Sequence, residues 1–403
     1  MNHQISRRSL LQGAAAVALS QLLLGCDRSK ESLEILFLEN SIPAQLIKGF
    51  QKSLTQGEKV RFRPQTQITE IFDLMFNLKQ LENSDSDPKN IIDWLFNRTE
   101  KYPSLTTLGD AWLTAAIEQN LIQPLAIESL ANWQKLPANW QKLVRRNSQG
   151  EITANGTVYG APYRWGGTVI AYRRDRLDPL NISLQDWSDL WRPELRDRLS
   201  LLDSPREVIG LTLKKLGKSY NAEDLTAVPE LKPELLALHQ QTKLYSSEHY
   251  LEPLVLGDTW VAVGWSTDIL PLLERYPEIE FTIPQSGTSL WADLWVKPQL
   301  PEAVGENESV EPDVIAQWID YCWQPKIAQQ ISLFTNAVSP ILTTIDSADI
   351  PKQLQKNVLF NSEVLNSDRS EFLLPLQPQT QQQYRDLWSE VRQSNHDFGN
   401  RES

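Results

Sequence analysis

The stretch that decides the fold class is residues 33–81, LEILFLENSIPAQLIKGFQKSLTQGEKVRFRPQTQITEIFDLMFNLKQL. Its first six residues form an apolar run typical of a buried strand, and residues 41–54 then carry apolar side chains at helical spacing. Residues 59–64 alternate like a second strand, and residues 69–81 return to the helical period. Strand, helix, strand, helix at this spacing predicts parallel βαβ units and therefore an α/β fold.

The rest of the chain continues the mixed pattern. An amphipathic helix is predicted from Asp110 to Leu121 or Ile122, and residues 157–177 read as one or two strands broken by Gly166 and Gly167. Further strands are expected at 258–265, 279–284 and 289–298, with helices between them. A chain of this length favours two lobes with at least two crossings between them.

The N-terminus has the build of an export signal, expected to cover residues 1–25. Arg7 and Arg8 precede a Leu- and Ala-rich run too short to span a membrane. "SRRSLL" resembles a twin-arginine signal, although the general secretory route stays open. "LLLGC" resembles a lipobox, which implies lipidation of Cys26 and a tether over residues 26–32; the alternative is an uncleaved anchor. Both interpretations place the protein outside the cytoplasm and hold it at the periplasmic side of the membrane.

Composition narrows the function classes. The chain has 51 acidic against 39 basic residues, a net charge of −12, which argues against nucleic acid and anionic lipid head groups as partners. Once Cys26 is lipidated, Cys322 is the one thiol left, so neither an internal disulfide nor a cysteine metal cluster is expected. Four histidines and the lack of G-x-S-x-G or H-E-x-x-H motifs predict a protein that is not an enzyme, with no cofactor and no metal.

Acids and tryptophans gather at the predicted strand ends. Trp265 ends one strand where a helix begins, Glu207 lies in the first turn of another helix, and Trp291 and Asp293 share a face of residues 289–298. Ligands of open α/β sheets bind outside the carboxyl ends of strands. Indoles and carboxylates together hold an ammonium group by cation–π attraction and charge-assisted hydrogen bonds. The pattern predicts a site for a small cationic solute.

Each of these residues also has a purely structural interpretation. Ser204, followed by a proline and by Glu207 at the third helical position, forms a capping box. Trp265 alone is typical of a core residue, and Asp293 could form a structural ion pair with Arg164 or Lys297. Arginines around the same block suggest a further alternative, an anion receptor that uses Arg164, Arg173 and Arg174.

Four segments together resemble one family. They are YGAPYRWGGTVIAYRRDRLDP (159–179), the stretch from SLQDWSDLW to LGKS (183–219), VAVGW (261–265) and SLWADLWVKP (289–298). Their order and spacing resemble those of bacterial spermidine/putrescine-binding proteins, the extracellular solute-binding receptors (family 1) of ABC importers.

The resemblance implies the type II periplasmic-binding-protein fold, with two lobes of mixed sheet flanked by helices and a hinge between them. The first lobe would comprise 33–162 with a return near 288–345, and the second 163–287 with C-terminal helices at 346–403. A polyamine-like ligand, an ABC permease partner and a monomeric state are also implied.

Carried over residue by residue, the resemblance assigns Glu207, Trp265, Trp291 and Asp293 to the polyamine cleft. Ser204 stands where the family has a second acid, and Asp203 beside it could serve instead. In the first lobe, Glu39 and Asp110 are acids at places where the family has aromatic clusters. Two other functions remain as alternatives: a hydrolase or metal enzyme on the same scaffold, and a lipoprotein with a scaffold role and an emptied cleft.

Overall fold

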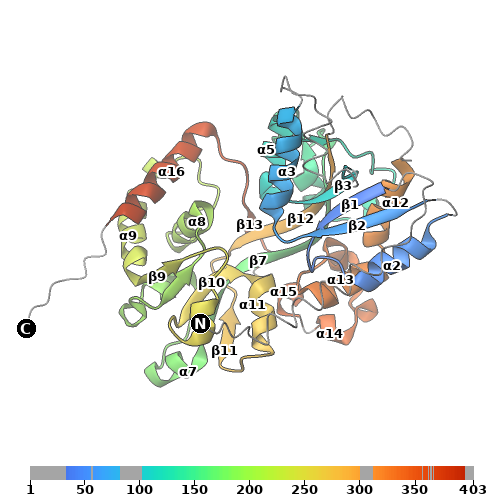
Figure 1. Cartoon of the computed structure of the whole chain (residues 1–403). Coiled ribbons are helices and arrows are strands. Elements are labelled where there is room, and N and C mark those ends of the chain that lie inside the picture. Colours follow the sequence, from blue (N-terminus) through green and yellow to red (C-terminus); the bar gives the residue numbers. More distant parts are fainter. Residues whose placement is uncertain are drawn as a thin grey trace, which may run out of the picture.

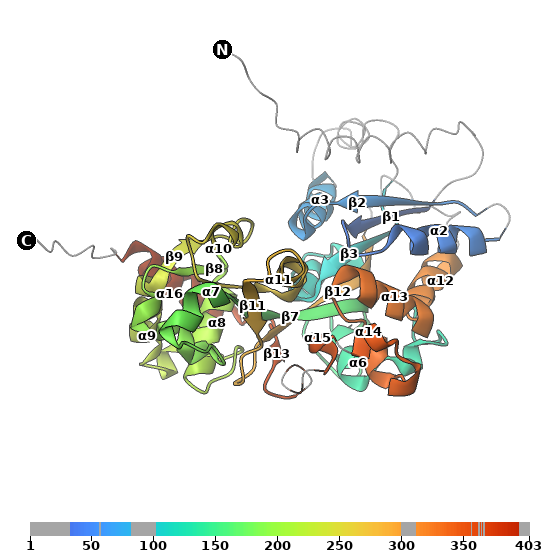
Figure 2. The ribbon, with the colours of Figure 1, turned by 90° about the horizontal axis from the view of Figure 1, so that it is seen from below.

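The computed structural model describes residues 33–55, 58–81, 102–299, 312–355, 357–361 and 367–394, together with Glu363 and Leu365. Two helix-covered bodies lie side by side and are joined through a shared sheet (Figures 1 and 2). Among these residues no helix has the length and apolar character needed to cross a membrane. The predicted signal, Cys26 and the tether lie outside the described residues.

The α/β prediction is confirmed. The strands of the main sheet are β1 (Leu33–Leu38), β2 (Val60–Gln65), β3 (Leu105–Gly109), β4 (Ile122–Gln123), β7 (Ala161–Arg173), β8 (Leu199–Leu201), β9 (Thr242–Tyr245), β10 (Val261–Trp265), β11 (Ile279–Thr282), β12 (Ser289–Pro298) and β13 (Glu371–Phe372). Two short strands, β5 (Arg145–Arg146) and β6 (Thr157–Val158), pair separately.

Helices cover both ends of this sheet (Figure 1). They are α2 (Ala44–Ser53), α3 (Ile68–Leu81), α5 (Leu113–Glu118), α6 (Ala138–Val144), α7 (Arg174–Leu177), α8 (Pro205–Lys215), α9 (Leu231–Gln241), α10 (Glu252–Leu256), α11 (Ser266–Leu273), α12 (Pro312–Cys322), α13 (Pro325–Thr335), α14 (Lys352–Gln355), α15 (Val358–Asn361) and α16 (Pro378–Gln393). Short 3-10 turns connect several of them, among them η2 (Asp110–Trp112), η5 (Trp187–Trp191) and η9 (Pro340–Thr344).

The sheet order is β2-β1-β3-β12-β7-β10-β8-β9. β1 runs parallel to β2 and β3, and β8 runs parallel to β9 and β10, as expected for βαβ units. β7 and β12 are antiparallel to each other and to their outer neighbours. The sheet is therefore parallel at its two ends and antiparallel in the middle.

β7 and β12 connect the two bodies. The first half of β7 pairs with β12, up to Gly167 opposite Leu290, and its second half pairs with β10 from Thr168 onward. The sequence suggested that Gly166 and Gly167 break this strand, but β7 continues through both. The two glycines leave room for side chains that cross the strand. A methyl group at Gly166 would lie 2.4 Å from the indole of Trp291, closer than any Cβ can approach.

The hydrophobic core is divided at this same point. Tyr163 and Trp165 pack with β1, β3, α12 and α13 in a first core, whereas Val169 and Ile170 pack in the second body. The sequence placed residues 346–403 wholly in the second lobe. Ile350, Leu354, Leu359 and Leu365 pack in the first core instead, and Tyr384 and Val391 pack in the second. Apolar burial thus divides this C-terminal segment between the two cores.

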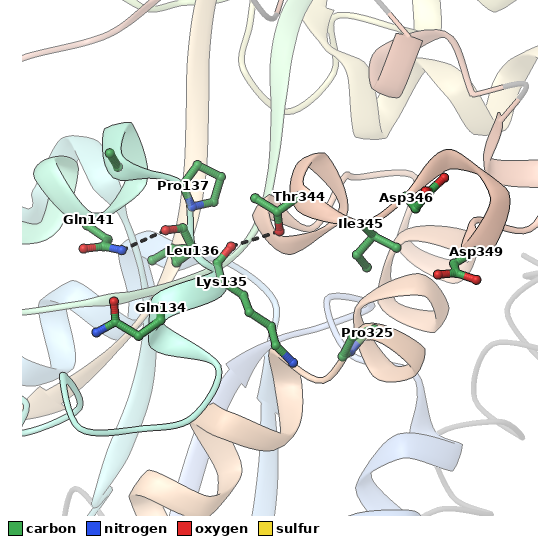
Figure 3. A pocket seen from close by; sticks show the side chains of 11 residues that line it. Gln134, Lys135, Leu136, Pro137, Gln141, Pro325, Thr344, Ile345, Asp346 and Asp349 are labelled. Atoms are coloured by element: carbon green, nitrogen blue, oxygen red, sulfur yellow. Dashed lines mark hydrogen bonds between the residues drawn. The ribbon is translucent and has the colours of Figure 1, made fainter.

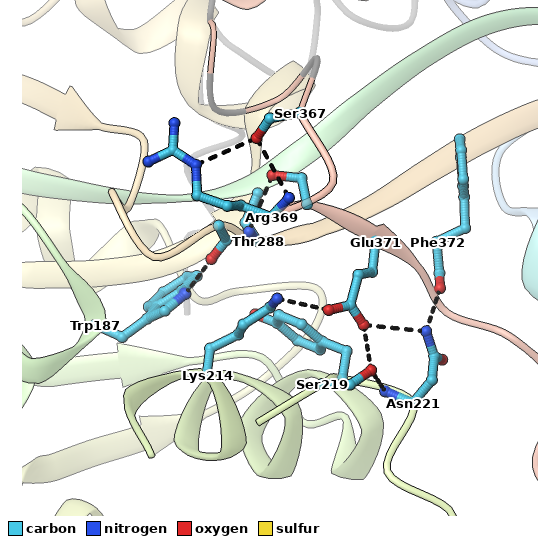
Figure 4. A network of polar contacts seen from close by, with 12 residues as sticks. Trp187, Lys214, Ser219, Asn221, Thr288, Ser367, Arg369, Glu371 and Phe372 are labelled. Carbon is cyan, nitrogen blue, oxygen red and sulfur yellow. Dashed lines mark hydrogen bonds and ion pairs between the residues drawn. The ribbon is translucent and has the colours of Figure 1, made fainter. Parts of the chain in front are cut away.

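The chain therefore crosses a third time at β13, where Phe372 packs against the first core and Leu373 against the second. Figure 4 shows how the crossing segment is fastened: the ammonium of Lys214 lies 2.6 Å from a carboxylate oxygen of Glu371, and Ser219 donates to the same carboxylate. The side-chain amide of Asn221 donates to the carbonyl of Phe372, and the N–H of Glu371 donates to the carbonyl of Thr288. These bonds tie β13 to α8 and to the start of β12.

Two expected helices are shorter than predicted. The helix expected from Asp110 to Leu121 or Ile122 is a 3-10 turn followed by α5, which ends at Glu118. Asn120 adopts φ +52°, and Ile122 then joins the sheet opposite Pro298. The stretch SLQDWSDLW (183–191) carries Trp187 and Trp191 four positions apart, which predicts a helix with both indoles in the core. It forms only the turn η5, which Asp186 caps, and Trp187 is fully buried.

Candidate functional site

The acids and tryptophans singled out in the sequence meet where the two bodies join. We call the group comprising Arg164, Glu207, Trp265, Asp268, Trp291 and Asp293 the hinge site. β7 and β12 supply Arg164, Trp291 and Asp293; the end of β10 supplies Trp265; and the first turns of α8 and α11 supply Glu207 and Asp268. Both bodies therefore contribute side chains.

Asp293 is paired with Arg164. The two residues are direct neighbours across β12 and β7, and Arg164 Nε donates to Asp293 Oδ2 at 2.6 Å. The side chains are 4% and 7% exposed. Burial raises the pKa of Asp293, while the guanidinium opposes that rise. The structural alternative foreseen for Asp293 is thus present, with Arg164 rather than Lys297 as its partner.

Trp291, Asp293 and Trp295 alternate along β12 and are expected on one face, but their environments differ. Trp295 is fully buried and stacks on Tyr163 with the ring centroids 4.5 Å apart. Trp291 is half-buried and packs on Gly166 and on Ser266 at the start of α11. Asp293 lies between them, next to a bulge that adds one residue to β7. Only the Trp291 end of this face approaches the second body.

Glu207 is buried and bonded. Ser289 Oγ donates to its Oε2 at 2.7 Å, and the predicted N-cap is present because Ser204 Oγ accepts from the N–H of Glu207. Burial raises the pKa of Glu207, and the hydrogen bonds from Ser289 and Thr168 oppose the rise. The carboxylate points at β12 and β7, so it is more than a helix cap.

Trp265 and Asp268 share one support, Tyr250. The N–H of Trp265 donates to the Tyr250 hydroxyl at 3.2 Å, and that hydroxyl donates to Asp268 Oδ2 at 3.0 Å. Gly264 makes this possible, because a methyl group there would lie 1.9 Å from the Tyr250 ring. Asp268 is exposed to solvent, yet the protein around it raises its pKa, with Arg164 opposing the rise.

Sequence reasoning missed Asp268. It stands at the third position of α11, where an acid is ordinarily read as a favourable helix terminus. Its position in the sequence offered one signal: Asp268 follows the strand-end residue Trp265 by three positions, just as Glu207 follows the helix cap Ser204 by three. The charges of Asp268 and Glu207 both contribute to raising the pKa of Tyr250, so both acids lie within electrostatic reach of its hydroxyl.

The remaining predicted site residues differ in burial. Asp203 and Glu39 are exposed at the ends of β8 and β1. Asp110 is buried at the end of β3, where its Oδ1 accepts the N–H of Ala292 at 2.8 Å. Burial raises the pKa of Asp110 to about 7; the Ala292 bond and Arg146 oppose the rise, and Asp293 adds to it. Asp110 is therefore a neighbour of the Asp293 pair rather than an open ligand group.

An aromatic pair follows Asp110. Trp112 is 37% exposed and lies against Phe72 of α3 with ring centroids 4.6 Å apart. Its indole also approaches Gly109, the residue opposite Asp293 in the sheet. The first body thus has one partly exposed tryptophan after β3, and Trp112 was not among the predicted ligand residues.

A surface depression of about 630 Å³ lies elsewhere, in the first body between α6 and η9 (Figure 3). Leu136, Gln141, Thr344 and Asp349 are among its lining residues, and Thr344 Oγ1 donates to the carbonyl of Lys135 at 3.0 Å. None of the predicted ligand residues lines it. Its walls hold no cluster of acids with tryptophans, so the hinge site remains the candidate.

A family model described as "Bacterial extracellular solute-binding protein" matches residues 101–362, which include the whole hinge site. The chain belongs to this family. Relatives named for a ligand include the putrescine/cadaverine-binding protein of Pseudomonas aeruginosa, 26% identical over 250 residues, which are 59% of this chain and 67% of that protein. The putrescine-binding periplasmic protein PotF of Escherichia coli is 26% identical over 260 residues, 60% of this chain and 66% of the relative.

Solved structures agree on the fold. The spermidine/putrescine ABC transporter substrate-binding protein PotD from Streptococcus pneumoniae superposes with a TM-score of 0.71 at 18% identity, covering 90% of this chain and 99% of the other. A putative spermidine/putrescine ABC transporter from Listeria monocytogenes gives 0.64 at 20% identity over 91% and 100%. The two-lobed periplasmic-binding-protein fold is confirmed.

Proposed function

We propose that this protein is the substrate-binding component of an ABC importer and that it binds a small organic cation, polyamine-like in its ammonium chemistry, between its lobes. The observation that carries the proposal is the hinge site: Ser289 at the start of β12 holds Glu207, and the Tyr250 hydroxyl links Trp265 with Asp268, where two strands pass from one lobe to the other. The names of the relatives, which refer to putrescine, cadaverine and spermidine, support the ligand class.

The electrostatics of the hinge site support an ammonium ligand. Burial raises the pKa of Glu207, and desolvation by the surrounding protein raises the pKa of Asp268 although its side chain is partly open to solvent. An ammonium group between them would supply charge-assisted hydrogen bonds, and indole faces would add cation–π attraction of about 0.5–2 kcal/mol each. Such contacts, made with both lobes at once, are stronger in a closed form than in an open one and would favour closure.

Export, a lipid anchor at Cys26, a permease partner and a monomeric state belong to the same proposal. They rest on the N-terminal sequence and on the family, because a receptor for an importer must stay near its permease outside the cytoplasm. The net charge of −12 favours cationic over anionic solutes as ligands.

Isothermal titration calorimetry tests the ligand class, using the purified protein with spermidine, putrescine, the monoamine 4-amino-1-butanol, neutral amino acids and inorganic phosphate. We expect heat with an amine and its loss in Glu207→Gln/Asp268→Asn. Glu390→Gln, which removes an exposed carboxylate paired with Lys232 at the far side of the second lobe, is the matched control and should bind as the unaltered protein does. Binding of phosphate without binding of any amine would refute the proposal and favour the anion receptor.

A further inference from the structure

Arg164 places a permanent positive charge inside the hinge site. It lies on β7 directly opposite Asp293, and a single hydrogen bond of 2.6 Å joins the two side chains. Its guanidinium carbon lies 5.8 Å from the ring centroid of Trp291. A carboxylate and an indole face are the partners expected for a bound ammonium, and here a side chain of the protein already occupies both.

The same charge acts on the second lobe. Arg164 opposes the rise that desolvation causes in the pKa of Asp268 on α11, so the guanidinium lies within electrostatic reach of acids on both lobes. Asp268 differs from Asp293 in being open to solvent, with the Tyr250 hydroxyl as its hydrogen-bond donor. A ligand ammonium can therefore reach Asp268, whereas Asp293 is buried and paired.

We propose that Arg164 determines specificity by filling the cation position beside Asp293 and Trp291, so that the site accepts a ligand with one ammonium group and rejects diamines and triamines. The inference deepens the proposed function and rests on it. A second ammonium brought to this end of the site would face a like charge and a carboxylate that is already neutralised, and such juxtapositions discriminate between ligands.

The other end of the ligand would then be neutral or a hydrogen-bond acceptor. The indole N–H of Trp291 is buried and has no acceptor among the described residues. A buried donor without a partner favours a group that can accept from it. The ammonium end would lie with Asp268, Glu207 and Trp265, where the carboxylates carry no protein cation in direct contact among the described residues.

Calorimetry with two matched amines tests the inference. Putrescine and 4-amino-1-butanol share a four-carbon chain and differ in one ammonium that is replaced by a hydroxyl. We expect the unaltered protein to bind 4-amino-1-butanol about tenfold more tightly or better, a difference near 1.4 kcal/mol. In Arg164→Leu, Asp293 becomes available and the order should reverse in favour of putrescine.

Three further variants are controls for the role of the Arg164 charge. Arg174→Leu removes an exposed arginine of the neighbouring segment, which pairs with Glu280, and should keep the preference of the unaltered protein. Arg164→Lys retains a cation and should also keep it. Arg164→Leu/Asp293→Asn removes both charges and should show no gain for putrescine. If Arg164→Leu does not fold, the ranking of the two amines by the unaltered protein and by Arg164→Lys decides.

The two proposals fail differently. Tighter binding of putrescine than of 4-amino-1-butanol by the unaltered protein would overturn the role of Arg164 and leave the amine receptor intact. An equal preference in Arg164→Leu and the unaltered protein would do the same. No heat from either amine with any variant would overturn the proposed function itself, and the inference with it.

Discussion

Replacing Asp110 with asparagine should change how the stability of this protein depends on pH. Asp110 is 7% exposed, and its Oδ1 accepts the N–H of Ala292, a bond that an asparagine Oδ1 can keep. The substitution therefore removes an ionisable proton and leaves the hydrogen bond in place. The effect should appear in the free energy of unfolding rather than in the fold.

The magnitude follows from the pKa. Burial raises the pKa of Asp110 from 3.8 to about 7, so the folded protein holds this proton between pH 4 and 7 while the unfolded chain has released it. Stability from this group is greatest in acid and falls as pH rises through that window. At ~1.4 kcal/mol per pKa unit the full penalty above pH 7 is about 4 kcal/mol, of which about 2–3 kcal/mol develops between pH 5 and 8.

Urea unfolding of the unaltered protein and of Asp110→Asn at pH 5, 6, 7 and 8 measures this difference. We expect the variant to gain on the unaltered protein by about 2–3 kcal/mol across the series. Asp224→Asn is a control that should show no change with pH in this series, because hydrogen bonds from Thr226 and Gln383 lower the pKa of Asp224 and its contribution is lost only in more acidic solution. Parallel pH profiles for Asp110→Asn and the unaltered protein would refute the reasoning.

Three further predictions concern packing and pairing at the hinge site. Asp293→Ala leaves the buried Arg164 charge unpaired and should lower the free energy of unfolding by about 3–5 kcal/mol, with Asp293→Ala/Arg164→Leu less destabilised than the sum of the single changes; additive effects in this cycle would contradict a coupled pair. Gly264→Ala places a methyl group 1.9 Å from the Tyr250 ring and should cost about 1–3 kcal/mol in chemical denaturation, so an unchanged unfolding midpoint would show that Tyr250 moves freely. Gly166→Ala must displace the Trp291 indole, because the added carbon would lie 2.4 Å from it. This variant should bind the amine about tenfold more weakly in calorimetry, a difference of about 1.4 kcal/mol. Gly217→Ala is the control and should leave ligand affinity nearly unchanged, since nothing lies near the methyl group there.

Much of the fold follows from local sequence pattern. The βαβ start at residues 33–81, the strand SLWADLWVKP and the helix that begins at Pro205 all lie where apolar period and caps predicted them. These signals are local, because alternation of side chains and helix capping depend on residues a few positions apart. The acids and tryptophans at strand ends could be found in the same way, since the end of a strand is itself a local feature.

What the sequence could not supply were the partners of these residues. Arg164 and Asp293 are 129 positions apart, and their pairing depends on the register between β7 and β12, including the bulge beside Asp293. In the sequence Asp268 is an ordinary acid in a first helical turn. The fold gives it a hydrogen bond from the Tyr250 hydroxyl and the electrostatic influence of Arg164. The composition, the α/β order and the candidate residues are thus properties of the chain; which carboxylates are neutralised and which stay open to solvent was decided by tertiary packing, because charge pairing acts across space and not along the sequence.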